Sequence, residues 1–281
     1  MRTLPNFVMI GPGKSGTTWI YRLLREHPDV YVPETKEVMY FNEFYDRGED
    51  WYRSFFEHVD GETAVGEVSN TYIFDERVAG RIRRYNPSMR LITSLRNPID
   101  RAFSHYLFLR RNGKVSGSFE DIIGGEHRVV ERGLYHRHLR PFWQEFPDSQ
   151  ILVLDFDTLA DDSRQFGRAI FEHLEVDASF WPESADERAL GAMRPRSKLV
   201  ARLAKAVAVG VRRLGHPELV TRLKESSVMK LLFEPIDRSE YPTLDLTTRK
   251  RLQQYYRDDA ERLSERVGVD FAGKWFGRDD S

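Results

Sequence analysis

Short apolar runs alternate with helically spaced apolar positions along the first two thirds of the chain. The run Phe7–Ile10 ends in Gly-Pro-Gly, which is typical of a buried strand that enters a tight loop. Thr17–Glu26 then carries apolar residues three and four positions apart and ends before Pro28, as an amphipathic helix does. The pattern therefore predicts a strand, a loop and a helix at the start of the chain.

The same alternation continues downstream. Further strands are predicted at Thr63–Ser69, Arg90–Arg96 and Ile151–Phe156, and helices at Asp75–Tyr85, Asn97–Arg111, Leu139–Phe146 and Ser163–Leu174. Strands that alternate with helices predict an α/β fold with a central, mostly parallel sheet flanked by helices. After Trp181 the strand pattern fades, and 197–214 and 247–267 have helical spacing. We therefore expect a single domain over residues 1–281 with a helical C-terminal portion.

Composition narrows the class of protein. Hydrophobic residues make up 40% and charged residues 31% of the 281, which is typical of a soluble globular chain. The formal net charge of −1 gives no overall field that favours nucleic acid. Cysteine is absent, which excludes disulfides, thiol nucleophiles and cysteine-ligated metals. The sequence has no apolar run near the ~20 residues of a membrane span and no signal-peptide pattern, so we expect a cytoplasmic protein without an integral membrane segment.

The loop after the first strand has residues suited to an oxyanion. Its sequence from Gly11 is Gly-Pro-Gly-Lys-Ser-Gly-Thr-Thr, in which the glycines allow a tight turn and close approach to a ligand. The following helix points free N–H groups and the positive end of its dipole at the loop. Lys14 adds a full charge, and Ser15, Thr17 and Thr18 add hydroxyl donors. These features predict a site for a terminal, multiply charged oxyanion, with an ordinary strand–helix turn as the alternative.

The loop lacks the spacing of an ATPase phosphate loop. That loop needs a glycine, four residues and then Gly-Lys-Ser/Thr, but Val8 occupies the position of the first glycine. Asp155 and Asp157 follow an apolar strand as a magnesium ligand would, yet acidic residues that cap the strand end explain them equally well. No metal site is predicted, because His136-x-His138 lacks supporting ligands. A small-molecule kinase that uses ATP and magnesium stays as an alternative.

A second feature follows the predicted strand Arg90–Arg96. Arg96 ends this strand, and Ser104 lies eight residues further on, in the next helix. At the carboxyl edge of a parallel sheet such a pair can face a ligand in the crevice. Arginine binds a phosphate through two parallel hydrogen bonds, and serine can add a third. An arginine at a strand end is also common as a surface ion-pair partner, so Arg96 and Ser104 alone do not distinguish a phosphate site from a surface ion pair.

The two features together resemble the sulfotransferase superfamily, whose donor is 3′-phosphoadenosine 5′-phosphosulfate (PAPS). The stretch "GKSGTTW" at 13–19 is similar to the 5′-phosphosulfate loop of the cytosolic enzymes, with Gly13 in place of a proline. The stretch "LRNPIDRAFSHY" at 95–106 is similar to the second signature, whose arginine and serine bind the 3′-phosphate. The likeness extends over most of the chain toward the Golgi glycan and bacterial branch and is weakest over 184–239.

The resemblance implies a P-loop-like sulfotransferase fold and a set of donor-binding residues. The expected contacts are Lys14, Ser15, Gly16, Thr17, Thr18, Trp19, Arg96, Ser104 and Tyr135, with Arg194, Arg196 and Lys198 as candidates in a basic loop. By analogy with phosphoryl transfer, positioning and charge stabilisation supply most of the rate. Lys14 is expected to stabilise the leaving phosphate oxygen. No metal is needed in principle, because cationic residues supply the charge.

The acceptor needs a general base, and Glu67 is the candidate. It ends a predicted strand at the same sheet edge as the loop, and the resemblance to the glycan branch implies this role for it. That branch usually has lysine at the next position, where this chain has Val68. Ser69 is expected to hold Glu67 or the donor.

The acceptor is expected to be a hydroxyl or amine of a small molecule or carbohydrate. The loops 33–45, 69–74 and 114–126 are expected to line its site, with Tyr40, Phe41 and Tyr72 as aromatic contacts or, equally, as core residues. A non-catalytic phosphonucleotide-binding protein of the same fold is the second alternative function. The oligomeric state is not predicted.

Overall fold

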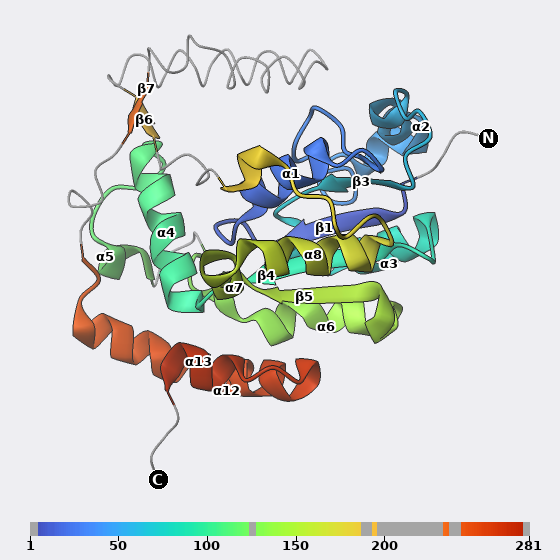
Figure 1. Cartoon of the computed structure of the whole chain (residues 1–281). Coiled ribbons are helices and arrows are strands. Elements are labelled where there is room, and N and C mark those ends of the chain that lie inside the picture. The colour runs from blue at the N-terminus through green and yellow to red at the C-terminus, as the bar shows by residue number, and fades with distance from the viewer. Residues whose placement is uncertain (1–4, 124–127, 187–192, 196–232, 236–242, 278–281) are drawn as a thin grey trace.

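A parallel sheet forms the centre of the computed structural model, which describes residues 5–123, 128–186, 193–195, 233–235 and 243–277. Its strands are β1 (Phe7–Gly11), β2 (Val30–Tyr31), β3 (Ala64–Val68), β4 (Arg90–Leu95) and β5 (Ile151–Asp155). All of the pairs are parallel, in the order β2-β3-β1-β4-β5 (Figure 1). The predicted α/β class and parallel sheet are confirmed.

Helices follow or connect the strands. They are α1 (Thr17–Glu26), α2 (Gly48–Arg53), α3 (Arg77–Tyr85), α4 (Pro98–Arg111), α5 (Phe119–Ile123), α6 (Tyr135–Glu145), α7 (Phe156–Asp161), α8 (Ser163–Leu174), α12 (Leu246–Val267) and α13 (Phe271–Phe276). Pro98 begins α4, where the missing N–H costs nothing and the fixed φ suits a helix. Asn97 caps this helix by accepting from Ile99 N at 3.0 Å.

The two faces of the sheet bury two hydrophobic clusters. Alternate residues of β1 divide between them: Val8 and Ile10 pack with α3, α6, α12 and α13, whereas Phe7 and Met9 pack with α1 and α8. Every residue of β1 and β3 is buried, as expected for central strands covered on both sides (Figure 1). This rigid centre fixes the carboxyl ends of β1, β3 and β4, where the loops begin.

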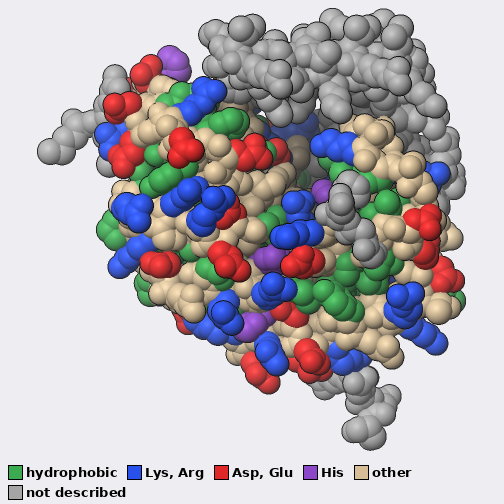
Figure 2. Space-filling model, turned by 180° about the vertical axis from the view of Figure 1, so that it is seen from behind, with side chains coloured by type: hydrophobic (Ala, Val, Ile, Leu, Met, Phe, Trp, Pro, Cys, Tyr) green, Lys and Arg blue, Asp and Glu red, His purple; other side chains and the backbone are tan. Residues whose placement is uncertain are grey.

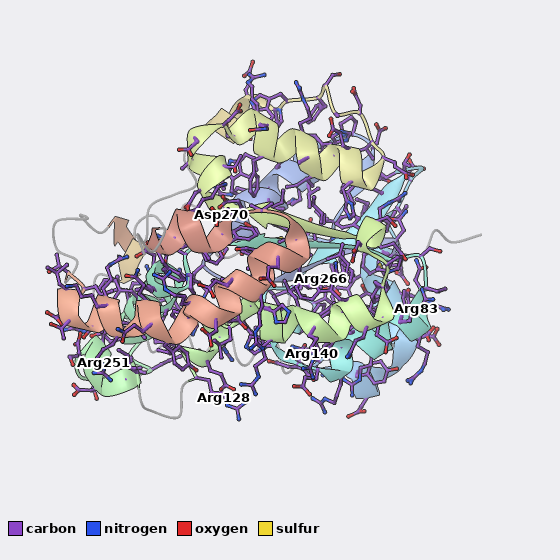
Figure 3. All side chains as sticks on the ribbon, turned by 90° about the horizontal axis from the view of Figure 1, so that it is seen from below. Arg83, Arg128, Arg140, Arg251, Arg266 and Asp270 are labelled. Atoms are coloured by element: carbon purple, nitrogen blue, oxygen red, sulfur yellow. The ribbon has the colours of Figure 1, made fainter. Side chains whose placement is uncertain are left out.

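The C-terminal helices cover the outside of α6 and extend to α4. Arg266 of α12 lies over the ring of Trp143 in α6 at 5.1 Å and donates to Asp148 at 2.8 Å (Figure 3). Asn97, the cap of α4, donates to the carbonyl of Trp275 in α13 at 3.0 Å. A third cluster packs Ile99, Ala102 and Tyr106 of α4 against Leu252 and Tyr256 of α12. The C-terminal portion therefore supports the segment that carries Arg96 and Ser104.

The start of α6 and the strands beyond Trp181 are among the differences from the sequence prediction. Helix α6 begins at Tyr135, four residues before the predicted start, because Asp259 of α12 accepts from the backbone N–H groups of His136 and Arg137. Beyond Trp181, β6 (Met193–Pro195) and β7 (Phe233–Pro235) form an antiparallel pair that the sequence did not predict. Their three-residue strands are far apart in sequence, so no local pattern marks them. The predicted helix at 197–214 lies outside the described residues.

Charges of both signs are mixed over the surface on the side shown in Figure 2. A hollow of about 800 Å³ lies between α3, α6 and α12, and four arginines and four carboxylates line it. These residues are Arg77, Arg137, Arg140, Arg262, Glu76, Glu145, Asp258 and Asp259. Such balanced charge does not favour an anionic nucleotide. Among the helices that the structure describes, none combines the length and the apolar character of a membrane span.

Candidate active site

The loop between β1 and α1 requires glycine at its two ends. Gly11 has φ +108°, and a Cβ there would lie 2.5 Å from the carbonyl oxygen of Asn70. Gly16 precedes α1 with φ +79°, and a Cβ there would lie 3.0 Å from Leu159. The first turn of α1 has no side-chain cap, so its N–H groups are available to a ligand. The hydroxyl of Ser15 is fully buried without a hydrogen-bond partner in the described structure.

Cations gather around this loop. Burial, followed by the charges of Arg111, Arg96 and Lys36, lowers the pKa of Lys14 to about 8. The Lys14 ammonium also lies 5.1 Å from the ring centre of Phe108. Lys36 donates to Thr18 Oγ1 at 2.9 Å. Lys14 and Arg96, which were predicted from separate motifs, therefore lie close enough for their charges to interact.

One face of α4 is turned to the loop. Ser104, Phe108 and Arg111 lie at positions i, i+4 and i+7, and two of them act on Lys14. Ser104 is half-buried on this face, and its contact with the donor stays a prediction. Burial and the charges of Arg101, Arg132 and Lys14 lower the pKa of His105 to about 3, so its imidazole is neutral.

Tyr135 makes a hydrogen bond to the backbone of Arg96. Its side chain is fully buried, and its hydroxyl donates to the carbonyl oxygen of Arg96 at 2.9 Å. The guanidinium of Arg96 lies 5.2 Å from the ring centre of Phe156. Tyr135 therefore fixes the backbone that carries Arg96. The predicted direct contact between Tyr135 and the donor stays a prediction.

Glu67 lies at the centre of a buried hydrogen-bond network. It is 0% exposed; Oε2 accepts from Ser69 at 2.6 Å and Oε1 accepts from Tyr72 at 2.8 Å. Burial raises the pKa of Glu67 to about 7, although the two hydroxyls offset part of the effect. The same hydroxyls accept from the backbone N–H groups of Met39 and Phe41 at 3.2 Å each. The predicted contact between Ser69 and Glu67 is confirmed.

Glu37 is a second carboxylate at this edge and is only half-buried. It has φ +66°, and its N–H donates to the carbonyl of Val68 at 3.0 Å, next to Glu67. Its Oε1 accepts from Asn70 Nδ2 at 2.5 Å. The carbonyl of Asn70 in turn accepts from Gly13 N at 3.1 Å. One residue thus links the Glu37 carboxylate to the loop that carries Lys14.

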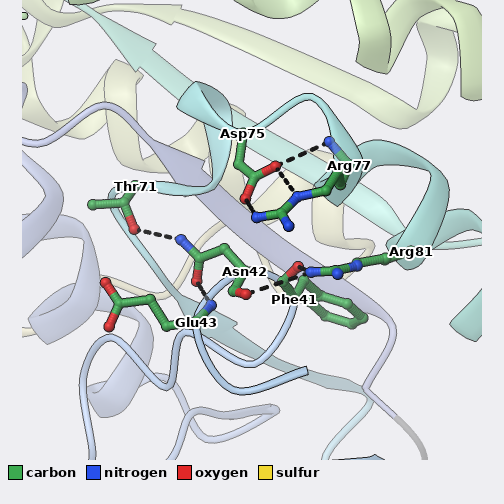
Figure 4. Close-up of polar contacts among 7 residues, drawn as sticks. All are labelled: Phe41, Asn42, Glu43, Thr71, Asp75, Arg77 and Arg81. Atoms are coloured by element: carbon green, nitrogen blue, oxygen red, sulfur yellow. Dashed lines mark hydrogen bonds and ion pairs between the residues drawn. The ribbon is translucent and has the colours of Figure 1, made fainter. Parts of the chain in front are cut away.

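The segment after Glu37 is tied to the end of β3 and to α3. Asn42 donates to Thr71 Oγ1 at 3.0 Å and accepts from its neighbour Glu43 N at 2.7 Å (Figure 4). Arg81 of α3 donates to the carbonyl of Phe41 at 2.8 Å (Figure 4). These contacts between segments hold the predicted acceptor loop in one conformation.

Four predicted ligand contacts lie in the core instead. Tyr40, Phe41 and Tyr72 are at most 2% exposed and pack among other aromatic rings, so they do not line an open acceptor site. Trp19 is 7% exposed, and its indole N–H donates to the carbonyl of Ala185 at 3.1 Å, on the α8 side of the sheet. The alternative prediction that Tyr40, Phe41 and Tyr72 are core residues was correct. Removing an aromatic ring from water stabilises the fold more than leaving it exposed for a ligand.

The acidic pair after β5 has a structural explanation. Asp155 caps α7 by accepting from Asp157 N at 3.1 Å, and it pairs with Lys274 at 2.7 Å. Within the described ranges no three carboxylate or imidazole groups form a metal cluster. Of the predicted basic loop, Arg194 is in β6 with an undescribed side chain, and Arg196 and Lys198 lie outside the described residues.

Sequence reasoning missed Lys36, Glu37 and Arg111. The stretch Glu34-Thr35-Lys36-Glu37 has the appearance of a solvated charged turn, and Arg111 that of a helix end. The predicted acceptor loop 33–45 contains Lys36 and Glu37, and its position after a short apolar run, which is β2, could have singled them out. Parallel strands bring their carboxyl ends to one edge, so residues after β2 also reach the site.

A glycine-edged loop, an uncapped helix and clustered cations define an α/β protein with a nucleotide-type anion site. A family model described as "Sulfotransferase domain" matches residues 4–194, and the chain belongs to this family. The solved sulfotransferase from Alicyclobacillus acidocaldarius has the same fold, with a TM-score of 0.72 and 24% identity over 97% of this chain and 99% of that one.

Curated relatives match parts of longer proteins. The human bifunctional heparan sulfate N-deacetylase/N-sulfotransferase 3 is 28% identical over 93% of this chain, which covers 30% of that protein. The membrane-associated sulfotransferase kil1 of Dictyostelium discoideum is 36% identical over 46% of this chain, which covers 29% of that protein. The chain therefore spans less than a third of the length of these relatives.

Proposed function

We propose that the protein transfers a sulfuryl group from PAPS to a hydroxyl or amine of a small molecule or carbohydrate. The observation that carries the proposal is the set of cations around the uncapped start of α1: Lys36 donates to Thr18 Oγ1 at 2.9 Å, and Arg96 and Arg111 lie close enough to lower the pKa of Lys14. Neighbouring cations stabilise a ligand with several negative charges, and PAPS has anionic groups at both its 5′ and 3′ positions. Membership of the sulfotransferase family supports this donor over ATP.

The donor half of the proposal assigns one group to each end of PAPS. Lys14 and the N–H groups of Gly16, Thr17 and Thr18 bind the 5′-phosphosulfate, with Lys14 at the leaving oxygen. Arg96 and Ser104 bind the 3′-phosphate. The support is that the Arg96 charge acts on Lys14 and that Ser104 shares a helix face with Phe108, which lies beside Lys14.

Two carboxylates, Glu67 and Glu37, are candidates for the general base. Glu67, the candidate from sequence, has a pKa of about 7, which suits a base at neutral pH, but it is 0% exposed and both oxygens accept hydrogen bonds from hydroxyls. Glu37 is half-buried and accepts through one oxygen from Asn70. We favour Glu37 as the base, because an acceptor hydroxyl can reach it, and give Glu67 the role of holding 38–41 in place.

In the proposed step the acceptor oxygen attacks sulfur in line with the bridging oxygen. The bond from sulfur to that oxygen breaks, and its electron pair stays on the phosphate beside Lys14. The acceptor proton passes to the carboxylate. Apart from this proton transfer, the residues position the reactants and stabilise charge.

Calorimetry without magnesium tests the donor. We expect 3′-phosphoadenosine 5′-phosphate (PAP) to bind at least tenfold more tightly than ADP, because only PAP has the phosphate that Arg96 would bind. Equal affinity, or a strict need for magnesium, would favour the kinase alternative. Tight PAP binding with no transfer to any acceptor would favour the non-catalytic alternative.

A panel of acceptors tests the substrate class. Labelled PAPS is incubated with de-N-sulfated heparin, simple phenols and aliphatic alcohols. The name of the human relative directs attention to the glycan amine, and the buried aromatic side chains at 40–41 and 72 offer no open platform for a phenol. We therefore expect the glycan to accept label faster than the phenols.

A further inference from the structure

Lys36 reaches the donor loop from a separate segment of the chain. Its ammonium donates to Thr18 Oγ1 at 2.9 Å and to Thr17 Oγ1 at 3.4 Å. Both threonines lie in the first turn of α1, at the positive end of the helix dipole. A cation is unfavourable at this end of a helix, whereas an anion is stabilised there. The first turn of α1 therefore offers an anion both the positive end of the helix dipole and the Lys36 ammonium.

The charges around Lys36 also suit an anionic ligand. Lys36, Arg96 and Arg111 each lower the pKa of Lys14, so the four cations lie close enough to repel one another. Ser15 adds a fully buried hydroxyl that has no partner among the described residues. Such an arrangement fits a ligand end with more than one anionic group. A phosphosulfate, with a phosphate and a sulfate in series, is such an end.

The backbone directs Lys36 and Glu37 to different sides. Lys36 contacts α1, whereas Glu37 contacts Asn70, which in turn accepts from Gly13 of the loop. The hydrogen bond from Glu37 N to the carbonyl of Val68 fixes this divergence to the end of β3. Lys36 therefore meets the loop at its α1 end, whereas Glu37 is linked through Asn70 to its Gly13 end.

We propose that Lys36 contacts the sulfuryl group of PAPS and is a second catalytic cation beside Lys14. This inference rests on the proposed function and adds a residue to it. Lys36 stays protonated while the bond from sulfur to the bridging oxygen breaks, the bond to the acceptor oxygen forms and the proton passes to Glu37. Its charge lowers the repulsion between the non-bridging sulfuryl oxygens and the incoming oxygen.

The proposal separates PAPS from PAP, which lacks the sulfuryl group. Calorimetry measures the Kd of each nucleotide for the wild type, for Lys36→Met and for Lys36→Arg. We expect Lys36→Met to weaken PAPS binding about tenfold, as loss of a charge-assisted hydrogen bond does, and PAP binding less than threefold. Lys36→Arg should recover most of the PAPS affinity. Lys250→Met, at an exposed lysine of α12, is the matched control and should change neither Kd.

The remaining outcomes are distinct. Equal weakening of PAPS and PAP would make Lys36 a ligand of the 5′-phosphate, and an unchanged PAPS affinity would give it only a structural role at Thr17 and Thr18. Either result overturns the inference and leaves the proposed function intact. Failure of the wild type to bind PAP more tightly than ADP overturns the proposed function itself. Retained PAP binding by Lys36→Met shows that the variant is folded.

Discussion

The candidate site has two halves: one in which cations cluster, and one in which hydrogen bonds within the protein hold the side chains. The donor half consists of Lys14, Lys36, Arg96 and Arg111, in which like charges lie together and lower the pKa of Lys14. The acceptor half consists of Glu37, Glu67, Ser69, Asn70 and Tyr72, in which each hydroxyl and amide has a protein partner.

This difference separates the proposed roles of the two halves. A nucleotide with several negative charges would be stabilised by the cations of the donor half. The acceptor half is already complete, with its carboxylates positioned by hydroxyl and amide donors before any ligand binds. Loss of a donor-half residue should therefore change affinity and charge stabilisation, whereas loss of an acceptor-half residue should change proton transfer or stability.

The largest expected effect lies in the acceptor half. Glu37→Gln should lower kcat about 10³-fold, within the usual range for a general base, and leave PAP affinity within twofold. Glu67→Gln should lower kcat less than tenfold, since the side chain is buried away from the acceptor and the glutamine oxygen keeps one of the two hydrogen bonds from Ser69 and Tyr72. Steady-state rates with the best acceptor of the panel measure both. The reverse order of effects would restore Glu67 as the base, as the sequence predicted.

The next effect lies in the donor half, at Lys14. Lys14→Met should lower kcat about 10²-fold, because the leaving oxygen loses its cation. In the wild type, kcat/KM should fall above about pH 8, since the pKa of Lys14 is about 8 and its protonated form is active. Lys14→Arg should remove this alkaline decline over the measured range, because arginine stays charged. A decline that persists in Lys14→Arg would assign it to another group.

A smaller effect is expected at the other end of the nucleotide. Arg96→Ala should weaken PAP binding about tenfold, while the affinity for adenosine 5′-phosphosulfate, which has no 3′-phosphate, should change less than twofold. Calorimetry on both ligands makes the comparison. Equal losses for the two would mean that Arg96 does not bind the 3′-phosphate.

The last prediction concerns the free energy of unfolding, to which the buried Glu67 should give a pH dependence. Its pKa is about 7 in the folded chain and about 4.5 as the reference value, so the folded state holds the proton more tightly. The contribution of Glu67 to stability should therefore be largest below pH 4.5, fall by about 3 kcal/mol as pH rises to 7, and then stay level. Urea unfolding between pH 5 and 8 measures the slope, which Glu67→Gln should reduce. An identical slope in the variant would exclude Glu67 as its source.

Local pattern predicted the parts of the fold that depend on neighbours in sequence. Buried strands such as β1 and β4 are short apolar runs, and the glycine loop and Pro98 mark where α1 and α4 begin. The motifs also placed Lys14 and Arg96 at one edge of the sheet. The β6–β7 pair was missed because its pairing depends on contacts distant in sequence.

The sequence by itself determined the α/β class and the positions of the glycine loop and of the Arg96–Ser104 segment, because these depend on patterns of neighbouring residues. Only the tertiary structure decided which carboxylate is open, because Glu67 and Glu37 differ in burial rather than in chemistry. It also decided that Lys36 joins the donor loop and that Tyr40, Phe41, Tyr72 and Trp19 belong to the core. Burial and proximity are set by packing between segments far apart along the chain, which no local pattern records.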